Sequence, residues 1–357
     1  SCTLWIDSDA YGTNSSVANN TPTTITANDT LSAGSHSWWI NCTDSEGEYK
    51  SSVYTIYTGG EIDNCAKLVD SYGHYVLTSD IINSSTSPCI NISANNIVFD
   101  CQNHLIDGDD SADYGIYVKR NSAQTTNITI KNCRVSDWDE AGVYIKNSDG
   151  VVVLNVTSYS NDRGIDIRNS DNLVLSNIST DSNSYGGFWI GSSDNVTVSD
   201  VVVTNETYYG GFYLLEVTNS TFTNITGNSN YAIFYMEDWC DYNIFSNIRG
   251  NSNDIGIKTS YNGFYNTFSN IVLTNNTYEG IFIYETDYST FKDIVIKNEQ
   301  GVTWGDIWYY TTRSMNHCHN TFINVTGTGG KPILFFNSTV TICLLYTSDA
   351  ADDGESV

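Results

Sequence analysis

A repeated pattern runs through most of this chain of 357 residues. Its clearest copy is 142–163, GVYIKNSDGVVVLNVTSYSNDR, and weaker copies lie on both sides of it. The copies begin at Gly115, Gly142, Gly164, Gly187, Gly211, Ala232, Gly256, Gly280 and Gly305. Successive starts are 27, 22, 23, 24, 21, 24, 24 and 25 residues apart. A period in this range predicts stacked repeat units that share one continuous core.

Each copy holds two short segments in which apolar residues alternate with polar ones, and neither has a helical period. The first reads Gly-Ile-x-Ile, as at Ile165 and Ile167, and a Ser-Asp-Asn type turn follows it. Two residues beyond the last inward valine, leucine or phenylalanine of the second segment stands an amide or acid: Asn155, Asn177, Asp200, Asn224, Asn247, Asn270, Asp293 and Asn324. An asparagine at one fixed corner predicts a ladder in which each amide bonds the next, with the amide on the inside.

Three short strands in each copy would make one coil of a parallel β-helix. Coils stack about 4.8 Å apart, and they wind in the right-handed sense because parallel crossovers almost always do. A leucine-rich repeat has an overlapping period, but it places two residues between its last leucine and its asparagine. Here a single residue separates Leu175 from Asn177, and leucine is scarce. The predicted fold is therefore all-β, with a right-handed parallel β-helix of about 9–11 coils.

The motif Gly-Ile-x-Ile…Ser-x-Asn-x-x-[Ile/Phe]-x-Asn-[Ile/Val] resembles the parallel β-helix (PbH1) repeat of NosD-like and pectate-lyase-like surface proteins. The stretch 65–108, with YVLTSD at 75–80 and IVFDCQNHLIDG at 97–108, is similar to the entry coil of such proteins. The resemblance covers about 62–342. It implies the fold and says little about activity, because this fold carries lyases, hydrolases, epimerases, adhesins and plain spacers.

Two segments lie outside the repeat domain, which we place at 61–342. Residues 1–60 are predicted to form a partial Ig-like β-sandwich, because 34–47, GSHSWWINCTDSEG, resembles the late strands of Ig-like modules. Early strands of such a module are missing. Residues 343–357 break the repeat, and 343–353, CLLYTSDAADD, resembles the translation of a sequencing-adapter read. The alternative for this tail is natural disorder.

The cysteines indicate a disulfide framework. Two pairs are expected: Cys2 with Cys42, and Cys65 with Cys89. Cys101 and Cys133 stand on neighbouring coils, either bonded or as small buried hydrophobes. Cys240 and Cys318 lie about three coils apart, which is too far for a bridge. No cysteine or histidine spacing suggests zinc or a redox site.

The chain is strongly acidic, with 15 basic against 41 acidic residues and a formal charge of −26. This charge argues against nucleic acid and anionic membranes as partners, and no apolar run is long enough to predict a membrane span. Glycosylation sequons in turns are credible glycan sites, at Asn28, Asn83, Asn205 and Asn337, whereas those on the amide ladder are not. Sequons and cysteines together favour an extracellular or cell-surface setting.

The middle residue of Gly-Ile-x-Ile must point outward, because its neighbours point inward. Seven of these residues form a predicted aromatic column: Tyr117, Tyr144, Trp189, Tyr213, Phe234, Phe282 and Trp308. Further aromatics stand just before the glycine: Tyr114, Tyr185, Tyr209, Tyr231, Tyr278 and Trp304. Such exposed strips mark interaction surfaces, and aromatic faces stack on sugar rings. The alternative is that the rings only stabilise the strands by stacking on one another.

Acidic residues beside the column suggest a different function. The candidates are Asp137, Asp139, Glu140, Asp162 and Asp166, which could serve glycosidic hydrolysis or hold Ca²⁺ for a lyase. Against an enzyme, the polygalacturonase-like motifs Asn-Thr-Asp, Gly-His-Gly and Arg-Ile-Lys are absent, and nearby bases are limited to Lys146, Arg163 and Arg168. The leading hypothesis is a β-helix that binds polysaccharide or mediates adhesion. A polysaccharide hydrolase or lyase, and a structural spacer without ligand, are the alternatives.

Overall fold

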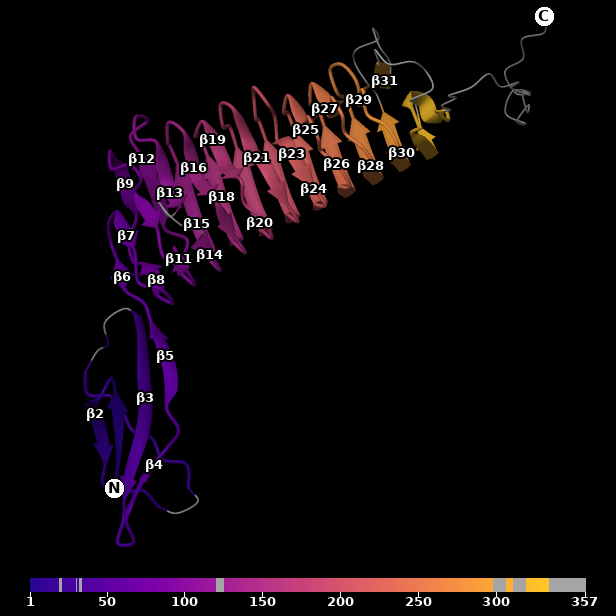
Figure 1. Ribbon diagram of the computed structural model, residues 1–357. Coiled ribbons are helices and arrows are strands. Elements are labelled where there is room, and N and C mark those ends of the chain that lie inside the picture. Colours follow the sequence, from indigo (N-terminus) through magenta and orange to yellow (C-terminus); the bar gives the residue numbers. More distant parts are fainter. Residues whose placement is uncertain are drawn as a thin grey trace, which may run out of the picture.

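The computed structural model describes residues 1–18, 21–29, 31, 34–119, 125–297, 306–310 and 319–333. Two β units follow each other along the chain, a small antiparallel sheet and a parallel solenoid of about ten turns (Figure 1). The solenoid confirms the predicted parallel β-helix. Predictions made for Trp304, Cys318, Asn337 and the tail 343–357 fall outside the described residues.

The N-terminal unit is one antiparallel sheet with strands in the order β2-β1-β3-β4, and β5 also pairs with β3. The strands are β1 (Cys2–Ile6), β2 (Asp9–Asn14), β3 (Gly34–Thr43), β4 (Glu48–Lys50) and β5 (Tyr54–Thr58). A disulfide joins Cys2 and Cys42, which are direct partners in the paired strands β1 and β3. In an Ig domain the disulfide instead connects two sheets. The Ig-like assignment therefore stays a prediction.

The solenoid contains two long sheets whose strand pairs are all parallel. We call the eleven-stranded one the column sheet. It consists of β7 (Ala66–Leu68), β10 (Ile90–Ile92), β13 (Tyr114–Val118), β16 (Ala141–Lys146), β19 (Arg163–Arg168), β21 (Gly186–Asp194), β23 (Phe212–Thr218), β25 (Ala232–Glu237), β27 (Ile255–Ser260), β29 (Ile281–Tyr284) and β31 (Ile307–Tyr310).

We call the fourteen-stranded sheet the bent sheet. It consists of β6 (Glu61–Ile62), β8 (His74–Leu77), β9 (Ile81–Ser84), β11 (Val98–Asp100), β12 (Leu105–Gly108), β15 (Thr129–Ser136), β18 (Val152–Tyr159), β20 (Val174–Asp181), β22 (Thr197–Thr204), β24 (Thr221–Asn228), β26 (Ile244–Asn251), β28 (Thr267–Thr274), β30 (Thr290–Lys297) and β32 (Thr321–Thr326). The short strands β14 (Thr125–Thr126) and β17 (Ser148–Asp149) pair separately.

Each long strand of the bent sheet turns a corner at the amide or acid identified in the repeat. Asn155 has φ 52° and Asn177 has φ 54°, the left-handed region that asparagine tolerates better than other non-glycine residues. The predicted ladder is present: Asn177 Nδ2 donates to Asn155 Oδ1 at 3.1 Å, and Asn155 Nδ2 to Asn132 Oδ1 at 2.9 Å. However, its amides lie on the outside. The inside placement was wrong, because Val153 and Val156 take the inward positions on either side of the corner.

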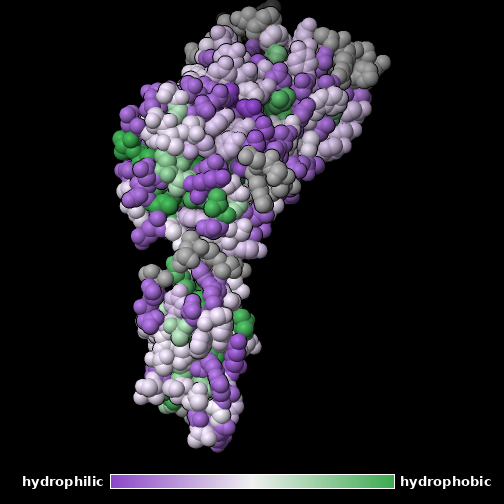
Figure 2. Space-filling model, turned by 60° about the vertical axis from the view of Figure 1, so that its left-hand side comes forward, coloured by the Kyte–Doolittle hydropathy of each residue, from purple (hydrophilic) through white to green (hydrophobic). Residues whose placement is uncertain are grey.

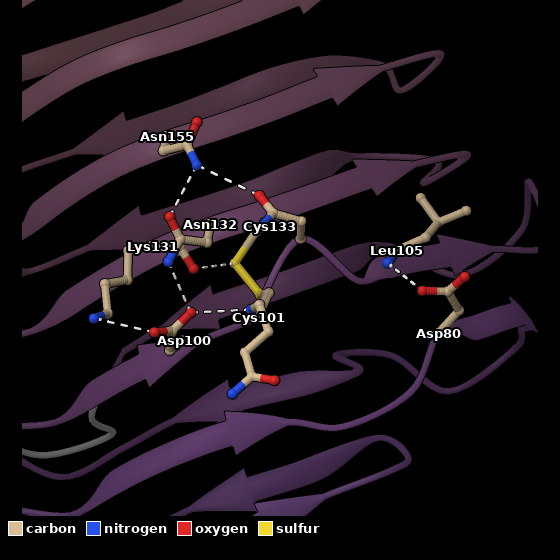
Figure 3. Close-up of a disulfide and its surroundings, with 10 residues drawn as sticks. Asp80, Asp100, Cys101, Leu105, Lys131, Asn132, Cys133 and Asn155 are labelled. Atoms are coloured by element: carbon tan, nitrogen blue, oxygen red, sulfur yellow. Dashed lines mark hydrogen bonds and ion pairs between the residues drawn. A yellow bond between two sulfur atoms is a disulfide. The ribbon is translucent and has the colours of Figure 1, made fainter.

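A disulfide between Cys101 and Cys133 clamps this corner between two coils (Figure 3). Beside it, Asn132 donates to Asp100 Oδ1 at 2.9 Å, and Lys131 pairs with Asp100 at 3.0 Å. Cys101 and Cys133 are therefore bonded to each other, which is one of the two possibilities that the sequence left open. The disulfides Cys2–Cys42 and Cys65–Cys89 are confirmed, and Cys240 is free and buried.

The core consists of inward side chains that lie directly over one another. One stack of phenylalanines has ring centroids 4.8–5.0 Å apart and nearly parallel planes, and it comprises Phe222, Phe245, Phe268, Phe291 and Phe322. A second stack contains Phe188, Phe212 and Phe234. The ring separation matches the strand spacing of about 4.8 Å. Residues one repeat apart therefore occupy equivalent positions in adjacent coils.

Phe234 was wrongly assigned to the outward column. Its side chain is 0% exposed and pairs with Phe212, while Tyr235 occupies the outward position opposite Tyr213. The error is a slip of one residue, which exchanges the two faces of a strand. Ile233 takes the position that glycine holds in other coils, and Gly227 and Gly250 make room for its side chain.

Hydrophilic residues cover most of the face in Figure 2, and apolar residues occur there in small separate patches. Among the described residues there is no helix long and apolar enough to cross a membrane.

Candidate functional site

Strand pairing places the outward residues of the column sheet in one unbroken register. This outward column comprises Tyr117, Tyr144, Asp166, Trp189, Tyr213, Tyr235, Lys258, Phe282 and Trp308. Tyr144 and Tyr213 are buried under neighbouring side chains, and the other aromatic members are partly exposed. The column thus presents a mixture of covered and accessible rings.

The first non-aromatic residue of the outward column, Asp166, forms an ion pair with Arg168. Asp166 is 1% exposed and accepts two hydrogen bonds from Arg168, Nε to Oδ1 at 2.8 Å and Nη2 to Oδ2 at 2.7 Å. The guanidinium lies 5.7 Å from the Tyr144 ring centre and 5.5 Å from that of Trp189. The hydrogen bond to Asp166 raises the pKa of Arg168. Charge and ring contacts together hold this arginine in place.

A second arginine is held in the same region. Arg163 Nη1 lies 2.9 Å from Glu140 Oε2 and 3.8 Å from Asp166 Oδ2. Its guanidinium lies 5.0 Å from the ring centre of Trp189 and 5.2 Å from that of Tyr185. Both arginines beside the outward column, Arg163 and Arg168, therefore have carboxylate partners within the protein.

The structure divides the five acids proposed from the sequence. Asp137, Asp139 and Asp162 line a hollow of about 430 Å³. Glu140 and Asp166 do not line it and pair with Arg163, which also lies 3.6 Å from Asp162. Burial raises the pKa of Asp137. Among the described residues, no three His, Cys, Asp or Glu side chains form a group that could hold a metal ion. The proposed Ca²⁺ site gains no support there.

A larger groove of about 840 Å³ lies beside the second half of the column. Four tyrosines line it: Tyr208, Tyr209, Tyr231 and Tyr235. Four ionisable residues also line it: Glu206, Glu237, Asp254 and Lys258. Sequence reasoning had noted Tyr209 and Tyr231 but missed the groove. Tyr208 and Tyr209 stand in the connection 206–211, which is longer than the corresponding connections 161–164, 183–187 and 230–233.

The rings along the groove are tilted against one another. Tyr209 meets Trp189 at 86° and Tyr213 at 51°, and Tyr213 meets Tyr235 at 90°. Tyr213 Oη donates to Glu237 Oε2 at 2.5 Å, and Lys258 Nζ lies 3.0 Å from Tyr231 Oη and 3.9 Å from the Tyr235 ring centre. Tilted rings cannot cover one another's faces completely, so aromatic faces and polar groups are presented together.

A ladder of buried side chains runs beneath the groove, and it comprises Asn161, Asn183, Glu206, Asn230 and Asn253. Each side-chain oxygen accepts the backbone N–H of the preceding ladder residue at 2.9–3.0 Å. Glu206 is the one acid in this series and is 1% exposed; burial raises its pKa to about 7. The sequence already contained a pattern that marks this ladder. Each ladder residue comes directly after a Ser or Asn, and each stands at the same distance from the corner amide or acid of its coil.

Comparisons with known proteins agree with this architecture. Residues 55–229 match the family model described as a right handed beta helix region. A search of curated proteins found no match. The N-terminal fragment of gene product 12 from bacteriophage Phi29 superimposes with a TM-score of 0.58 at 13% identity, covering 77% of this chain and 61% of that fragment.

A second solved structure is the A-module of a mannuronan C-5 epimerase from Azotobacter vinelandii. It superimposes with a TM-score of 0.54 at 12% identity, covering 76% of this chain and 89% of that module. Identities this low show a common fold alone. The stacked coils, the parallel sheets and the family match over residues 55–229 together show that this chain folds as a right-handed parallel β-helix.

Proposed function

We propose that this protein binds polysaccharide in the groove beside the outward column. The observation that carries the proposal is the groove of about 840 Å³ with Tyr208, Tyr209, Tyr231 and Tyr235 in its lining. Ligand sites of this size typically combine aromatic walls with a few polar groups that orient the ligand. Here the carboxylate, ammonium and phenol groups supply those polar contacts.

The arrangement of the rings supports a sugar ligand in particular. A pyranose offers C–H groups on its faces and hydroxyl groups around its edge, so it pairs with an aromatic face and adjacent hydrogen-bonding groups. Tyr208 is 63% exposed, and its ring meets that of Tyr209 at 74°. This exposed ring also lies 5.1 Å from that of Tyr185, at 30°, and exposed aromatic rings are the surfaces on which sugars stack.

Two further observations fit this reading. The disulfides Cys2–Cys42, Cys65–Cys89 and Cys101–Cys133 suggest an extracellular environment, where polysaccharides are encountered. One protein with the same fold is, by its name, an epimerase of mannuronan, which is a polysaccharide. We extend the proposal to display of the solenoid at the cell surface and to adhesion through the groove.

A polysaccharide hydrolase or lyase is the second candidate. Glu206 favours it, because a buried carboxyl group with a pKa near neutrality is a common property of catalytic acids. Release of reducing ends or unsaturated products from a polysaccharide panel would establish this activity. Binding without product formation, measured on the same panel, would retain the first candidate.

Removal of single tyrosines tests the binding proposal. We expect Tyr208→Ala and Tyr235→Ala to weaken binding roughly fivefold to tenfold, the loss of one ring–sugar contact. Binding is measured by glycan array and by affinity electrophoresis in polysaccharide gels. Tyr265→Ala is the matched control, because Tyr265 is 47% exposed on a different edge of the same sheet. Equal binding by all variants would contradict the groove as the site, and absence of binding by the unmodified protein would leave the spacer alternative.

A further inference from the structure

The charges that line the groove are unbalanced. Glu237 and Asp254 contribute carboxyl groups, whereas Glu206 is 1% exposed, and Lys258 is the one cation among the groove-lining residues. Lys258 is half-buried, with its ammonium group hydrogen-bonded to Tyr231 and placed over the Tyr235 ring. Its charge is therefore already engaged by phenol and aromatic groups of the groove.

The two arginines beside the outward column are also engaged. Arg168 makes its two hydrogen bonds to Asp166, and Arg163 lies against Glu140, Asp162 and Asp166. Buried or half-buried ion pairs of this kind do not release a partner without leaving a charge uncompensated. An anionic ligand on the column would find both arginines occupied.

We infer that the polysaccharide is uncharged, a neutral hexose or pentose polymer rather than a polyuronate or a sulfated glycan. This inference rests on the binding function proposed above and specifies its ligand class. A sugar carboxylate in the groove would approach Glu237 and Asp254 in a protein of formal charge −26. Like charges at such separations repel, and the surrounding apolar rings strengthen that repulsion by lowering the local dielectric constant.

Neutral sugar hydroxyls suit the same groups. Carboxylates accept hydrogen bonds from two or more hydroxyls, and the Lys258 ammonium group donates to their oxygens. The tyrosine rings contribute stacking, which does not require charge on the ligand. The groove therefore offers a neutral glycan favourable partners without the penalty that an anionic one would meet.

Paired polymers that differ only in charge test this inference. Polygalacturonate, polymannuronate and polyglucuronate are each compared with their carboxyl-reduced forms, in which CH₂OH replaces COO⁻ on an unchanged backbone. Retention of the full chain is measured by affinity electrophoresis at low and high NaCl. We expect at least one reduced polymer to bind about tenfold tighter than its parent, with little salt dependence, and residual binding of the parent to strengthen as salt screens the repulsion.

A charge-removing variant provides an independent readout. Asp254→Asn is expected to raise the ratio of polyuronate binding to reduced-polymer binding about twofold to fivefold, as loss of one partly screened charge would. Tighter binding of the parent polyuronate, or equal binding of both forms, would overturn the inference and keep the groove as a polysaccharide site. Failure of every polymer to bind would remove the proposed function and this inference together.

Discussion

The two edges of the column sheet carry similar residues and differ in shape. We call them the strand-start edge, where the groove lies, and the strand-end edge, where the chain leaves the sheet. The strand-end edge has its own buried ladder, formed by Ser220, Asn243, Asn266, Ser289 and Asn320. It also has exposed rings, Tyr242, Tyr265, Tyr288 and His319. The two hollows described above, of about 840 Å³ and 430 Å³, both lie at the strand-start edge.

Ring geometry accounts for the difference. At the strand-end edge each ring immediately precedes a ladder residue, so the ladder sets the ring positions. Tyr242 and Tyr265 lie 5.0 Å apart at 9°, Tyr265 and Tyr288 5.2 Å apart at 20°, and Tyr288 and His319 4.5 Å apart at 5°. These rings cover one another's faces. At the strand-start edge the tyrosines follow Glu206 in a lengthened connection and lie tilted. At the strand-end edge, regular stacking therefore covers ring faces with neighbouring rings. At the strand-start edge, the tilted rings of the connection 206–211 leave parts of their faces accessible.

The largest expected effect is at the strand-end ladder. Asn266 Oδ1 accepts the backbone N–H of Asn243 at 2.9 Å, and its Nδ2 donates to the Cys240 carbonyl at 2.7 Å. Asn266→Ala leaves both buried groups unpaired and should lower the free energy of unfolding by about 4 kcal/mol. Urea unfolding followed by circular dichroism measures it. Asn270→Gly is the control at the exposed corner, and an equal loss there would mean that the buried ladder has no special role.

Glu206 should make the strand-start edge sensitive to pH. Its pKa is about 7 in the folded protein against a usual 4.5, so the unfolded chain loses this proton first as the pH rises. Stability is then fully present below about pH 4.5 and falls as the pH rises to about 7, by on the order of 3 kcal/mol. Glu206→Asn, which restores the ladder amide, and the isosteric Glu206→Gln should both flatten this profile.

The measurement is the free energy of unfolding between about pH 4 and pH 8. Both variants should exceed the parent protein most clearly above pH 7. A parent profile that rises with pH through this window, or variants that keep the parent's slope, would show that Glu206 is not the group responsible. The strand-end ladder contains no acid and should contribute no such slope.

The smallest effect is expected for the stacked rings. Tyr265→Ala removes contacts with Tyr242 and Tyr288 and should lower stability by about 1 kcal/mol, with no change in polysaccharide binding. Tyr208→Ala should do the opposite, with weakened binding and nearly unchanged stability. Thermal unfolding and affinity electrophoresis on both variants measure this contrast. A binding loss in Tyr265→Ala would place sugar contacts at the strand-end edge as well.

Much of the architecture was predictable from local pattern. The period located equivalent positions in adjacent coils and identified the corner amides at Asn155 and Asn177. The disulfides Cys2–Cys42 and Cys65–Cys89 were also predicted from the sequence. The groove was not predictable, because it depends on how far the connection 206–211 departs from its neighbours. Arg163 and Arg168 also looked like candidate bases in sequence, and their pairing with Asp166 and Glu140 appears only in three dimensions.

The sequence by itself determined the coil, its stacking and the columns, because alternation and period are properties of neighbouring residues. Only the tertiary structure decided that Tyr235 faces outward and Phe234 inward. Alternation divides a strand into two faces, and a shift of one residue exchanges them. Space left by Gly227 and Gly250 allows Ile233 to replace glycine and sets that shift. Packing between coils likewise decided which aromatic faces are covered and which remain open.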